Sequence, residues 1–283
     1  MRITETVEGV RLARNPYLDL GKSFDCGQAF RFESTADGYA GVVGDLVLRI
    51  REEPDSYLFS GLDKARFDRV VRPFLDLDRD YAAAERTFLS DPVLAQAAQY
   101  GRGIRILRQD PFEALITFIF SQNNNIPRIR GMVRRLCEGF GAPLGGGHYA
   151  FPLPQALAGL SEEDLAPVRA GFRAKYAVDA ARRVCDGSVP LGRLASLPYA
   201  QAQALRRGRQ GRRLCASVRR GPPGGVPGGR LDEARVRAVL SRRAGAGIRP
   251  VCGPCAAVSV PLCARLIRVG NTANIRRYMG EFV

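Results

Sequence analysis

The chain has 283 residues, 46% hydrophobic side chains and a formal net charge of +15, which favours a globular protein of one large or two ordinary domains over a disordered or fibrous one. No apolar run approaches the ~20 residues that a membrane span needs, and the first residues lack an apolar signal core. We therefore expect a cytoplasmic protein without a membrane partner. Disulfides are not expected there for the three cysteines that precede residue 205.

Residues 1–77 are predicted to form an antiparallel β-sheet domain. Residues 29–32 alternate between apolar and polar side chains, and residues 39–50 contain apolar runs that break at Gly44-Asp45, a hairpin signal. A further short strand is expected at residues 57–59.

Helical periodicity begins at about residue 78 and predicts a helical domain over residues 78–205. Asp110 precedes Pro111, and Glu113 follows at the capping-box spacing, so a helix is expected from Pro111 to about Ser121. Its side chains are apolar nearly all round, which is typical of a buried helix. Other helices are expected at 127–138, after the Ser161/Asp164 cap, at 174–185 and at 198–205. A sheet followed by a helical array is an α+β arrangement.

The charge of the chain changes abruptly near residue 205. Residues 1–205 carry 26 Lys and Arg against 25 Asp and Glu, whereas residues 206–283 carry 17 Arg, no Lys and three acids. The net positive charge therefore belongs almost wholly to residues 206–283, which form an Arg-, Gly- and Pro-rich tail. This composition predicts a disordered third unit that follows an incomplete helical domain.

A polar segment, Ser121-Gln122-Asn123-Asn124-Asn125-Ile126-Pro127-Arg128-Ile129, joins the first two of these helices. Three consecutive asparagines are unfavourable inside a helix but favourable in a turn. Their amides donate and accept hydrogen bonds, which suits base edges, and Arg128 offers a planar fork that matches guanine or phosphate. The alternative is a capped interhelical turn with a solvated arginine.

Together with its flanks, this segment closely resembles the 8-oxoguanine DNA glycosylase family, the bifunctional glycosylase/AP lyases of the helix-hairpin-helix superfamily. The resemblance covers about residues 15–205, in the right order. Its motifs are Cys26-Gly27-Gln28-Ala29-Phe30-Arg31, Leu107-Arg108-Gln109-Asp110-Pro111-Phe112-Glu113, the asparagine triplet, residues 131–141 and Gly171-Phe172-Arg173-Ala174-Lys175-Tyr176.

The resemblance implies a role for five residues. Asn123 fills the hole left by the extruded base, while Arg128 and Arg173 bind the estranged cytosine. Phe172, where the family more often has tyrosine, wedges into the stack, and Gly27 offers its carbonyl to the N7–H of 8-oxoguanine. The alternatives are a core position for Phe172, a solvated charge for Arg173 and a strand bulge at Gly27.

The implied function is excision of 8-oxoguanine opposite cytosine from double-stranded DNA, by base flipping and Schiff-base chemistry in base-excision repair. We expect a monomer without cofactor or metal, associated with the nucleoid through its DNA. Cys252, Cys255 and Cys263 imitate a zinc site but lack a fourth ligand. A preference for another damaged purine, and a catalytically dead protein that binds damaged DNA, are the two alternatives.

The catalytic motifs of the family are missing from this reading frame. The family carries its Schiff-base lysine in Gly-x-Gly-x-Lys-Val-Ala-Asp-Cys and a helper aspartate in Pro-Val-Asp-Val, but no lysine follows Lys175 here. Read one nucleotide forward, the codons of residues 206–218 can encode Gly-Val-Gly-Ala-Lys-Val-Ala-Asp-Cys-Val-Leu-Leu-Phe. The lysine falls at Gln210, and the aspartate of a second shifted motif falls at Gly229. We infer a frame slip just before Arg206, so this chain has no catalytic residue.

Overall fold

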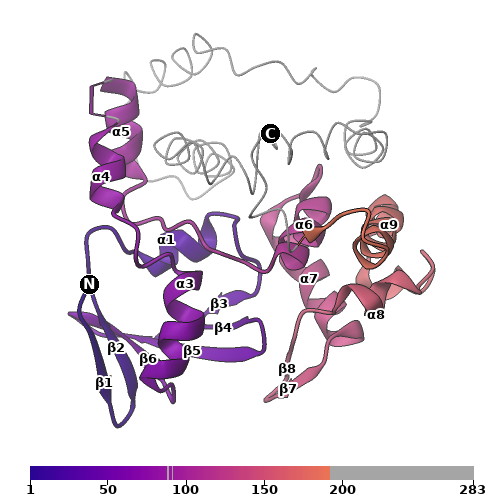
Figure 1. The fold of residues 1–283 in the computed structure, drawn as a ribbon, viewed down its shortest axis with the longest axis horizontal. Helices are drawn as coiled ribbons and strands as arrows, with labels where there is room; N and C mark the ends of the chain where they lie inside the picture. Colours follow the sequence, from indigo (N-terminus) through magenta and orange to yellow (C-terminus); the bar gives the residue numbers. More distant parts are fainter. Residues whose placement is uncertain (88, 91, 192–283) are drawn as a thin grey trace.

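Six antiparallel strands form one sheet in the computed structural model, which describes residues 1–191 except 88 and 91 (Figure 1). The spatial order is β1-β2-β6-β5-β4-β3. The strands are β1 (Ile3–Thr6), β2 (Gly9–Ala13), β3 (Phe32–Ser34), β4 (Gly38–Val43), β5 (Leu46–Glu52) and β6 (Ser56–Ser60). The predicted hairpin is confirmed, because β4 and β5 pair around Gly44-Asp45 and Gly44 adopts a φ of 61°. The predicted strand at residues 57–59 is confirmed as β6.

The predicted strand at residues 29–32 is wrong for its first three residues. Strand β3 begins at Phe32, and the side chains of the two residues before it are directed to the helices. Phe30 packs in the hydrophobic core of the helical layer, and the Arg31 guanidinium binds the Glu113 carboxylate at 3.1 Å. The alternation of apolar and polar side chains at residues 29–32 therefore arises from contacts with two layers, the helices and the sheet.

One face of the sheet is apolar and covered by short helices. Along β5, the side chains of Leu46, Leu48 and Ile50 are buried and alternate with more exposed residues, as a half-buried strand requires. Helix α1 (Leu20–Asp25) places Phe24 against Phe32, with ring centroids 4.0 Å apart. The expectation of strands throughout residues 1–77 was incomplete. Residues 64–74 also form a helical segment: α2 (Lys64–Arg66), a π-helical turn (Phe67–Val71) and α3 (Arg72–Phe74).

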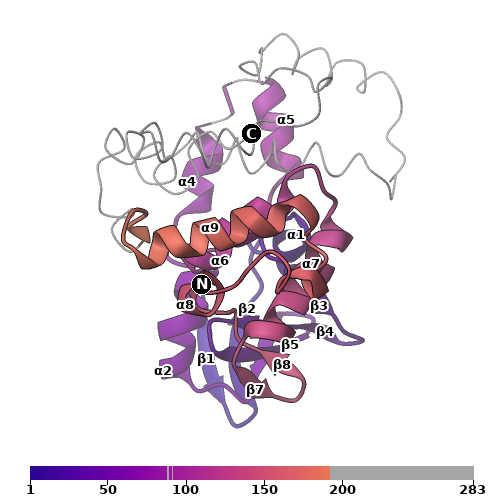
Figure 2. The same ribbon diagram turned by 90° about the vertical axis from the view of Figure 1, so that its right-hand side faces the viewer.

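A helical region follows residue 80, and its helices before residue 101 stand apart from the layer formed by those after residue 110 (Figures 1 and 2). Its helices are α4 (Tyr81–Arg86), α5 (Pro92–Tyr100), α6 (Pro111–Ser121), α7 (Ile126–Phe140), α8 (Pro154–Ala158) and α9 (Ala174–Cys185). The bounds predicted for α6 and α9 are confirmed, and α7 starts one residue earlier than predicted and ends two later. The two short strands β7 (Pro143–Gly145) and β8 (His148–Tyr149) form a hairpin. The helix predicted for residues 198–205 lies outside the described residues.

Two capping predictions have different outcomes. Asp110 accepts hydrogen bonds from the backbone N–H groups of Phe112 and Glu113 and so caps α6. The Glu113 side chain is turned to Arg31, so the expected capping box is only half made. Ser161 and Asp164 bond to each other reciprocally, but a 3-10 turn (Ala166–Val168) follows them instead of an α-helix.

The hydrophobic core has two clusters, one beneath the sheet and one among α6, α7, α8 and α9. Leu107 and Phe30 each reach into the cluster of the other layer. The Arg31–Glu113 ion pair crosses the same boundary, and the Arg31 guanidinium also donates to the Tyr149 carbonyl. These contacts hold the loop before β3 against the start of α6. Within the described residues, no helix is long and apolar enough to cross a membrane.

Candidate nucleic-acid interface

The segment between α6 and α7 is a tight turn, residues 122–125, called the Asn turn below. Its asparagines have distinct positions. Asn124 Nδ2 donates to the Phe120 carbonyl at 2.9 Å, and Asn125 caps α7 by accepting from the Arg128 backbone N–H at 3.0 Å. Asn123 is exposed, with a left-handed φ of 47°, and its amide makes no hydrogen bond to the described residues. Two asparagines thus fix the turn, and the third is presented to solvent.

Helix α7 carries a row of arginines on a stretch without acids, since no Asp or Glu lies between Glu113 and Glu138. Arg130 binds the Asp25 carboxylate at 2.7 Å and so connects α7 to α1. The exposed Arg128 guanidinium makes no hydrogen bond or ion pair within the described residues. Arg128 is therefore the cation beside the Asn turn that is available to an external anion or base.

Phe172 and Arg173 lie just before α9 in a 3-10 turn (Gly171–Arg173) and have opposite environments. The Phe172 side chain is 54% exposed, whereas Arg173 is 3% exposed. The two bland alternatives are wrong: Phe172 is not a core residue, and Arg173 is not a solvated charge. The Arg173 guanidinium lies 4.3 Å from the centroid of the Phe172 ring and binds the backbone of the Asn turn.

Gly27 lies in the loop between α1 and β3, with a φ of 80°. It is in no strand, so the strand-bulge alternative is wrong. A side chain at this position would begin 3.6 Å from Ile126 Cδ1, which places Gly27 beside the first residue of α7. The neighbouring Gln28 holds the loop, because its amide accepts from the Leu107 N–H at 3.1 Å and donates to the Arg105 carbonyl at 2.8 Å. Residues about 100 positions apart therefore meet at one edge of the molecule.

The ionisable groups at this edge favour binding over nucleophilic chemistry. Burial raises the pKa of the Cys26 thiol, so it stays protonated at neutral pH. Burial, with a smaller contribution from Arg128, lowers the pKa of Arg173. The chain has only three lysines, and each is engaged elsewhere: Lys22 donates to the Arg102 carbonyl, Lys64 pairs with Asp68, and Lys175 lies over the Tyr176 ring. No cluster of three or more His, Cys, Asp or Glu is placed to hold a metal in the part of the chain that the structure describes.

Comparison with known proteins relates this chain to DNA glycosylases. Residues 10–115 match the model of the 8-oxoguanine DNA glycosylase N-terminal domain. The chain is 34% identical over 170 residues to N-glycosylase/DNA lyase OGG1 of Arabidopsis thaliana, which covers 56% of this chain and 46% of that protein. It is 37% identical over 106 residues to N-glycosylase/DNA lyase of Saccharomyces cerevisiae, which covers 36% of this chain and 28% of that protein. The chain thus spans less than half the length of the curated relatives it matches.

Two solved structures extend the comparison to the fold. MBOgg1 in complex with a low-affinity DNA ligand superposes with a TM-score of 0.72 at 29% identity, covering 99% of this chain and 96% of that one. The Clostridium acetobutylicum 8-oxoguanine glycosylase/lyase, in complex with double-stranded DNA containing cytosine opposite 8-oxoG, gives a TM-score of 0.72 at 27% identity, covering 94% and 98%. Residues 10–115 and the fold of the chain thus match the 8-oxoguanine DNA glycosylase family.

Within this family framework, the structure brings together all five residues to which the sequence assigned a role. Asn123 lies in the Asn turn, and Arg128 follows it in the first turn of α7. Arg173 binds the backbone of the Asn turn and lies against Phe172, and Gly27 lies beside the start of α7. Their individual roles toward DNA stay predictions. The positions expected for the Schiff-base lysine and its helper aspartate, Gln210 and Gly229, lie outside the described residues, as does the Arg-rich tail. So do the three cysteines that imitate a zinc site.

The contacts that hold these residues in place were not predicted from the sequence. Gln28, Asp25 and Arg130 join the loop of Gly27 to the irregular segment before α6 and to α7. Gln28 belongs to the Cys26–Arg31 motif, which was the available signal. The Asp25–Arg130 pair has no signal in the sequence, since its members are 105 residues apart.

Proposed function

We propose that this chain recognises 8-oxoguanine opposite cytosine in duplex DNA but, as written, cannot cleave it. One observation carries the recognition: the exposed Phe172 ring, the Asn123 amide and the Arg128 guanidinium lie around one turn, and neither polar side chain has a hydrogen-bond or ion-pair partner among the described residues. A base must leave the helix before its glycosidic bond is accessible, and an aromatic wedge with a polar plug offsets part of the unstacking cost. The similarity to 8-oxoguanine glycosylases supports 8-oxoguanine opposite cytosine as the substrate.

In the proposed complex, Phe172 enters the stack beside the estranged cytosine and Asn123 occupies the place of the extruded base. Arg128 and Arg173 hydrogen-bond the estranged cytosine, a role that suits a planar guanidinium. The Gly27 carbonyl faces the N7–H that distinguishes 8-oxoguanine from guanine.

The proposed loss of cleavage follows from the chemistry that an AP lyase needs. A lysine amine attacks the sugar carbon, forms a Schiff base and permits β-elimination of the strand. None of the three lysines of the chain lies in the motif where the family carries this amine, and Gln210 occupies the expected position. The shifted codon there is tightly constrained, because Gln followed by Gly yields only Lys or Arg one nucleotide forward. A frame slip before Arg206 accounts for the loss.

Borohydride trapping tests the proposal on an 8-oxoguanine:cytosine duplex. We expect no covalent adduct with the chain as written and an adduct with the frame restored by one nucleotide. The chain as written with Gln210→Lys is the matched control, and we expect it to give none, because the flanking motif and the helper aspartate are still missing. An adduct with the chain as written would overturn the proposed inactivity.

Two further measurements complete the test. Sequencing the gene across the codons of residues 204–213 decides whether one nucleotide is miscounted. Cleavage by the frame-restored protein of 8-oxoguanine and of alkylated purines, each opposite cytosine, separates the two lesion classes. A preference for the alkylated base would reject the proposed substrate while retaining the glycosylase assignment.

A further inference from the structure

Arg135 is half-buried on α7 and shares one face of the helix with Arg128, because seven residues complete almost two turns and advance about 10 Å. Its Nε and Nη2 atoms donate to the Val168 carbonyl at 3.0 and 2.9 Å. Its guanidinium also lies over Gly131, where a side chain would begin 3.3 Å from Nη1. A guanidinium has five N–H donors, so these two hydrogen bonds leave both donors of Nη1 without a partner in the described residues.

Arg169 directly follows the residue that Arg135 binds, and its backbone is strained. It ends the 3-10 turn Ala166–Val168 with a φ of 59°, in the left-handed region where glycine is favoured and a Cβ atom is not. Its side chain is exposed, and its guanidinium makes no hydrogen bond or ion pair within the described residues. Backbone strain of this kind is typical of functional positions, so the contact of this side chain is sought outside the chain.

The guanidinium groups of Arg135 and Arg169, called the arginine pair below, lie close enough to repel each other. Burial lowers the pKa of Arg135, and the positive charge of Arg169 lowers it further. Glu138 opposes this repulsion only in part, because its carboxylate lies 3.7 Å from Arg134. Neighbouring cations without a carboxylate partner produce a positive potential, which a bound anion would relieve.

We propose that the arginine pair binds a backbone phosphate of the DNA strand that carries the estranged cytosine. This inference rests on the proposed function, which assigns Arg128 and Arg173 to that cytosine. Since Arg128 and Arg135 share one face of α7, the phosphates nearest to the arginine pair then belong to the cytosine strand. Guanidinium forks match phosphate oxygens, and such contacts fix the register of a protein on DNA without reading its sequence.

The salt dependence of binding tests the phosphate contact. The full-length chain is titrated, by fluorescence anisotropy at several NaCl concentrations, onto a duplex with a tetrahydrofuran abasic-site analogue opposite cytosine. Loss of one phosphate contact reduces the slope of log K against log [salt] by about one, and we expect this reduction for Arg169→Gln. Arg49→Gln is the matched control, because Arg49 is exposed on β5 without an ion pair in the described residues, and we expect it to retain the slope of the unmodified chain.

Methylphosphonate linkages identify the strand, since each removes the charge of a single phosphate. They are placed one at a time along the cytosine strand and, in separate duplexes, along the abasic strand. We expect one position on the cytosine strand to weaken binding of the unmodified chain several-fold and to have no further effect on Arg169→Gln. Such non-additivity is the signature of a direct contact between the two changed groups.

Arg169→Gly separates binding from folding. Glycine adopts the left-handed conformation without a steric cost, so we expect the denaturant midpoint of unfolding to rise. The salt slope should fall as it does for Arg169→Gln, because the same charge is lost. A residue that served the fold would instead lose stability in this variant.

Three results would overturn the inference: a slope for Arg169→Gln equal to that of Arg49→Gln, non-additivity with the abasic strand instead of the cytosine strand, or a lower unfolding midpoint for Arg169→Gly. Equal binding of intact and abasic duplexes by the unmodified chain would reject the proposed function instead. The salt slope of Arg169→Gln on the intact duplex would still decide the phosphate contact in that case.

Discussion

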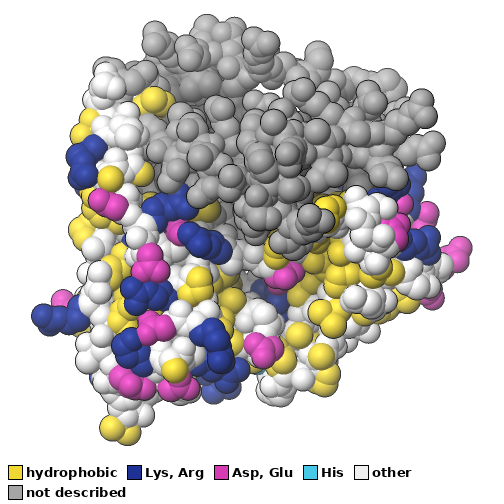
Figure 3. Space-filling view, in the orientation of Figure 1, with side chains coloured by type: hydrophobic (Ala, Val, Ile, Leu, Met, Phe, Trp, Pro, Cys, Tyr) yellow, Lys and Arg dark blue, Asp and Glu magenta, His cyan; other side chains and the backbone are white. Residues whose placement is uncertain are grey.

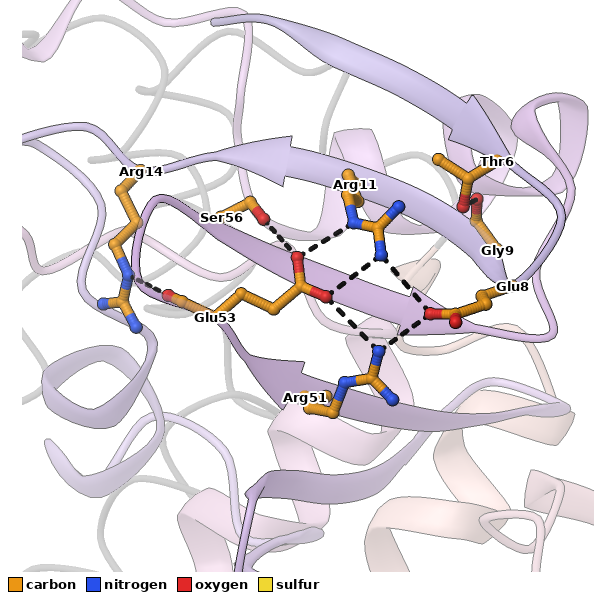
Figure 4. Close-up of polar contacts among 8 residues, drawn as sticks. All are labelled: Thr6, Glu8, Gly9, Arg11, Arg14, Arg51, Glu53 and Ser56. Carbon is orange, nitrogen blue, oxygen red and sulfur yellow. Dashed lines mark hydrogen bonds and ion pairs between the residues drawn. The ribbon is translucent and has the colours of Figure 1, made fainter.

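Several arginines of α7–α9 have partners of a different kind from those of the arginines on the sheet, although Arg130, Arg134 and Arg183 also pair with carboxylates. On the exposed face of the sheet, Arg11 and Arg51 share the carboxylates of Glu53 and Glu8 in a closed network (Figure 4). Over this part of the molecule, basic and acidic side chains alternate on the surface (Figure 3). Among the helices, Arg135, Arg173 and Arg182 instead donate to backbone carbonyls, and the described contacts leave Arg128 unpaired.

The difference matters for the electrostatic field, because a carbonyl satisfies N–H donors without cancelling their charge. Residues 1–77 carry eleven Lys and Arg against thirteen Asp and Glu, whereas residues 111–191 carry nine against seven. The sheet is therefore slightly acidic, with arginines that serve its own structure. The helices retain positive charge beside the Asn turn, where a polyanion is proposed to bind.

The largest expected effect comes from breaking a buried ion pair that joins the sheet to the helices. The side chains of Arg31 and Glu113 are 6% and 10% exposed, and burial raises the pKa of Glu113 while Arg31 opposes that rise. Arg31→Ala leaves an uncompensated carboxylate, so we expect a loss of about 3–5 kcal/mol in the free energy of unfolding, measured with denaturant at pH 7.

The loss from Arg31→Ala should shrink as the pH falls, because removal of Arg31 raises the pKa of Glu113 further and a protonated carboxyl tolerates burial. The double variant Arg31→Met with Glu113→Leu is the control, and we expect it to lose much less than the single variant. A single variant as stable as the unmodified chain would show that the pair does not join the layers.

An effect of intermediate size is expected from the two exposed arginines of α7, one without and one with an ion pair in the described residues. Arg128→Gln should weaken binding to an abasic-site duplex about tenfold, within the ~1–3 kcal/mol range of a good bidentate contact, and leave the unfolding midpoint unchanged. Arg134→Gln, also exposed on α7 but 3.7 Å from Glu138, is the matched control with a smaller expected loss. Equal losses for both variants, measured by fluorescence anisotropy, would mean that Arg128 contributes only general charge.

The smallest effect concerns the exposed network on the sheet. Hydrogen bonds from Arg11 and Ser56 lower the pKa of Glu53 to about 2. Because an unfolded glutamate titrates near ~4.3, the stability from Glu53 is present above that pH and is lost as the pH falls toward 2. Glu53→Gln should flatten acid unfolding, followed by circular dichroism, between about pH 4 and 2. Glu33→Gln, an exposed carboxylate on β3 without an ion pair to the described residues, should leave the curve unchanged.

Local signals in the sequence predicted part of the fold well. Asp110-Pro111 specified the start of α6, and Gly44-Asp45 specified the hairpin, because caps and two-residue turns depend on residues adjacent in the chain. Short elements such as α1 escaped prediction, since six residues give too little periodicity to detect. The strand predicted at residues 29–32 was mostly wrong because Phe30 and Arg31 contact the helices, and alternation cannot tell which layer a side chain meets.

The sequence by itself determined the family, the polar turn between two helices, and the absence of a lysine after Lys175, since motifs and composition are properties of the chain. The tertiary structure alone decided which arginine is buried and which is exposed. Arg128 and Arg173 look alike in sequence, yet the Arg128 side chain makes no hydrogen bond or ion pair to the described residues, whereas Arg173 binds the backbone of a turn 50 residues away. Burial and hydrogen-bond partners depend on distant segments, and only the folded chain brings these together.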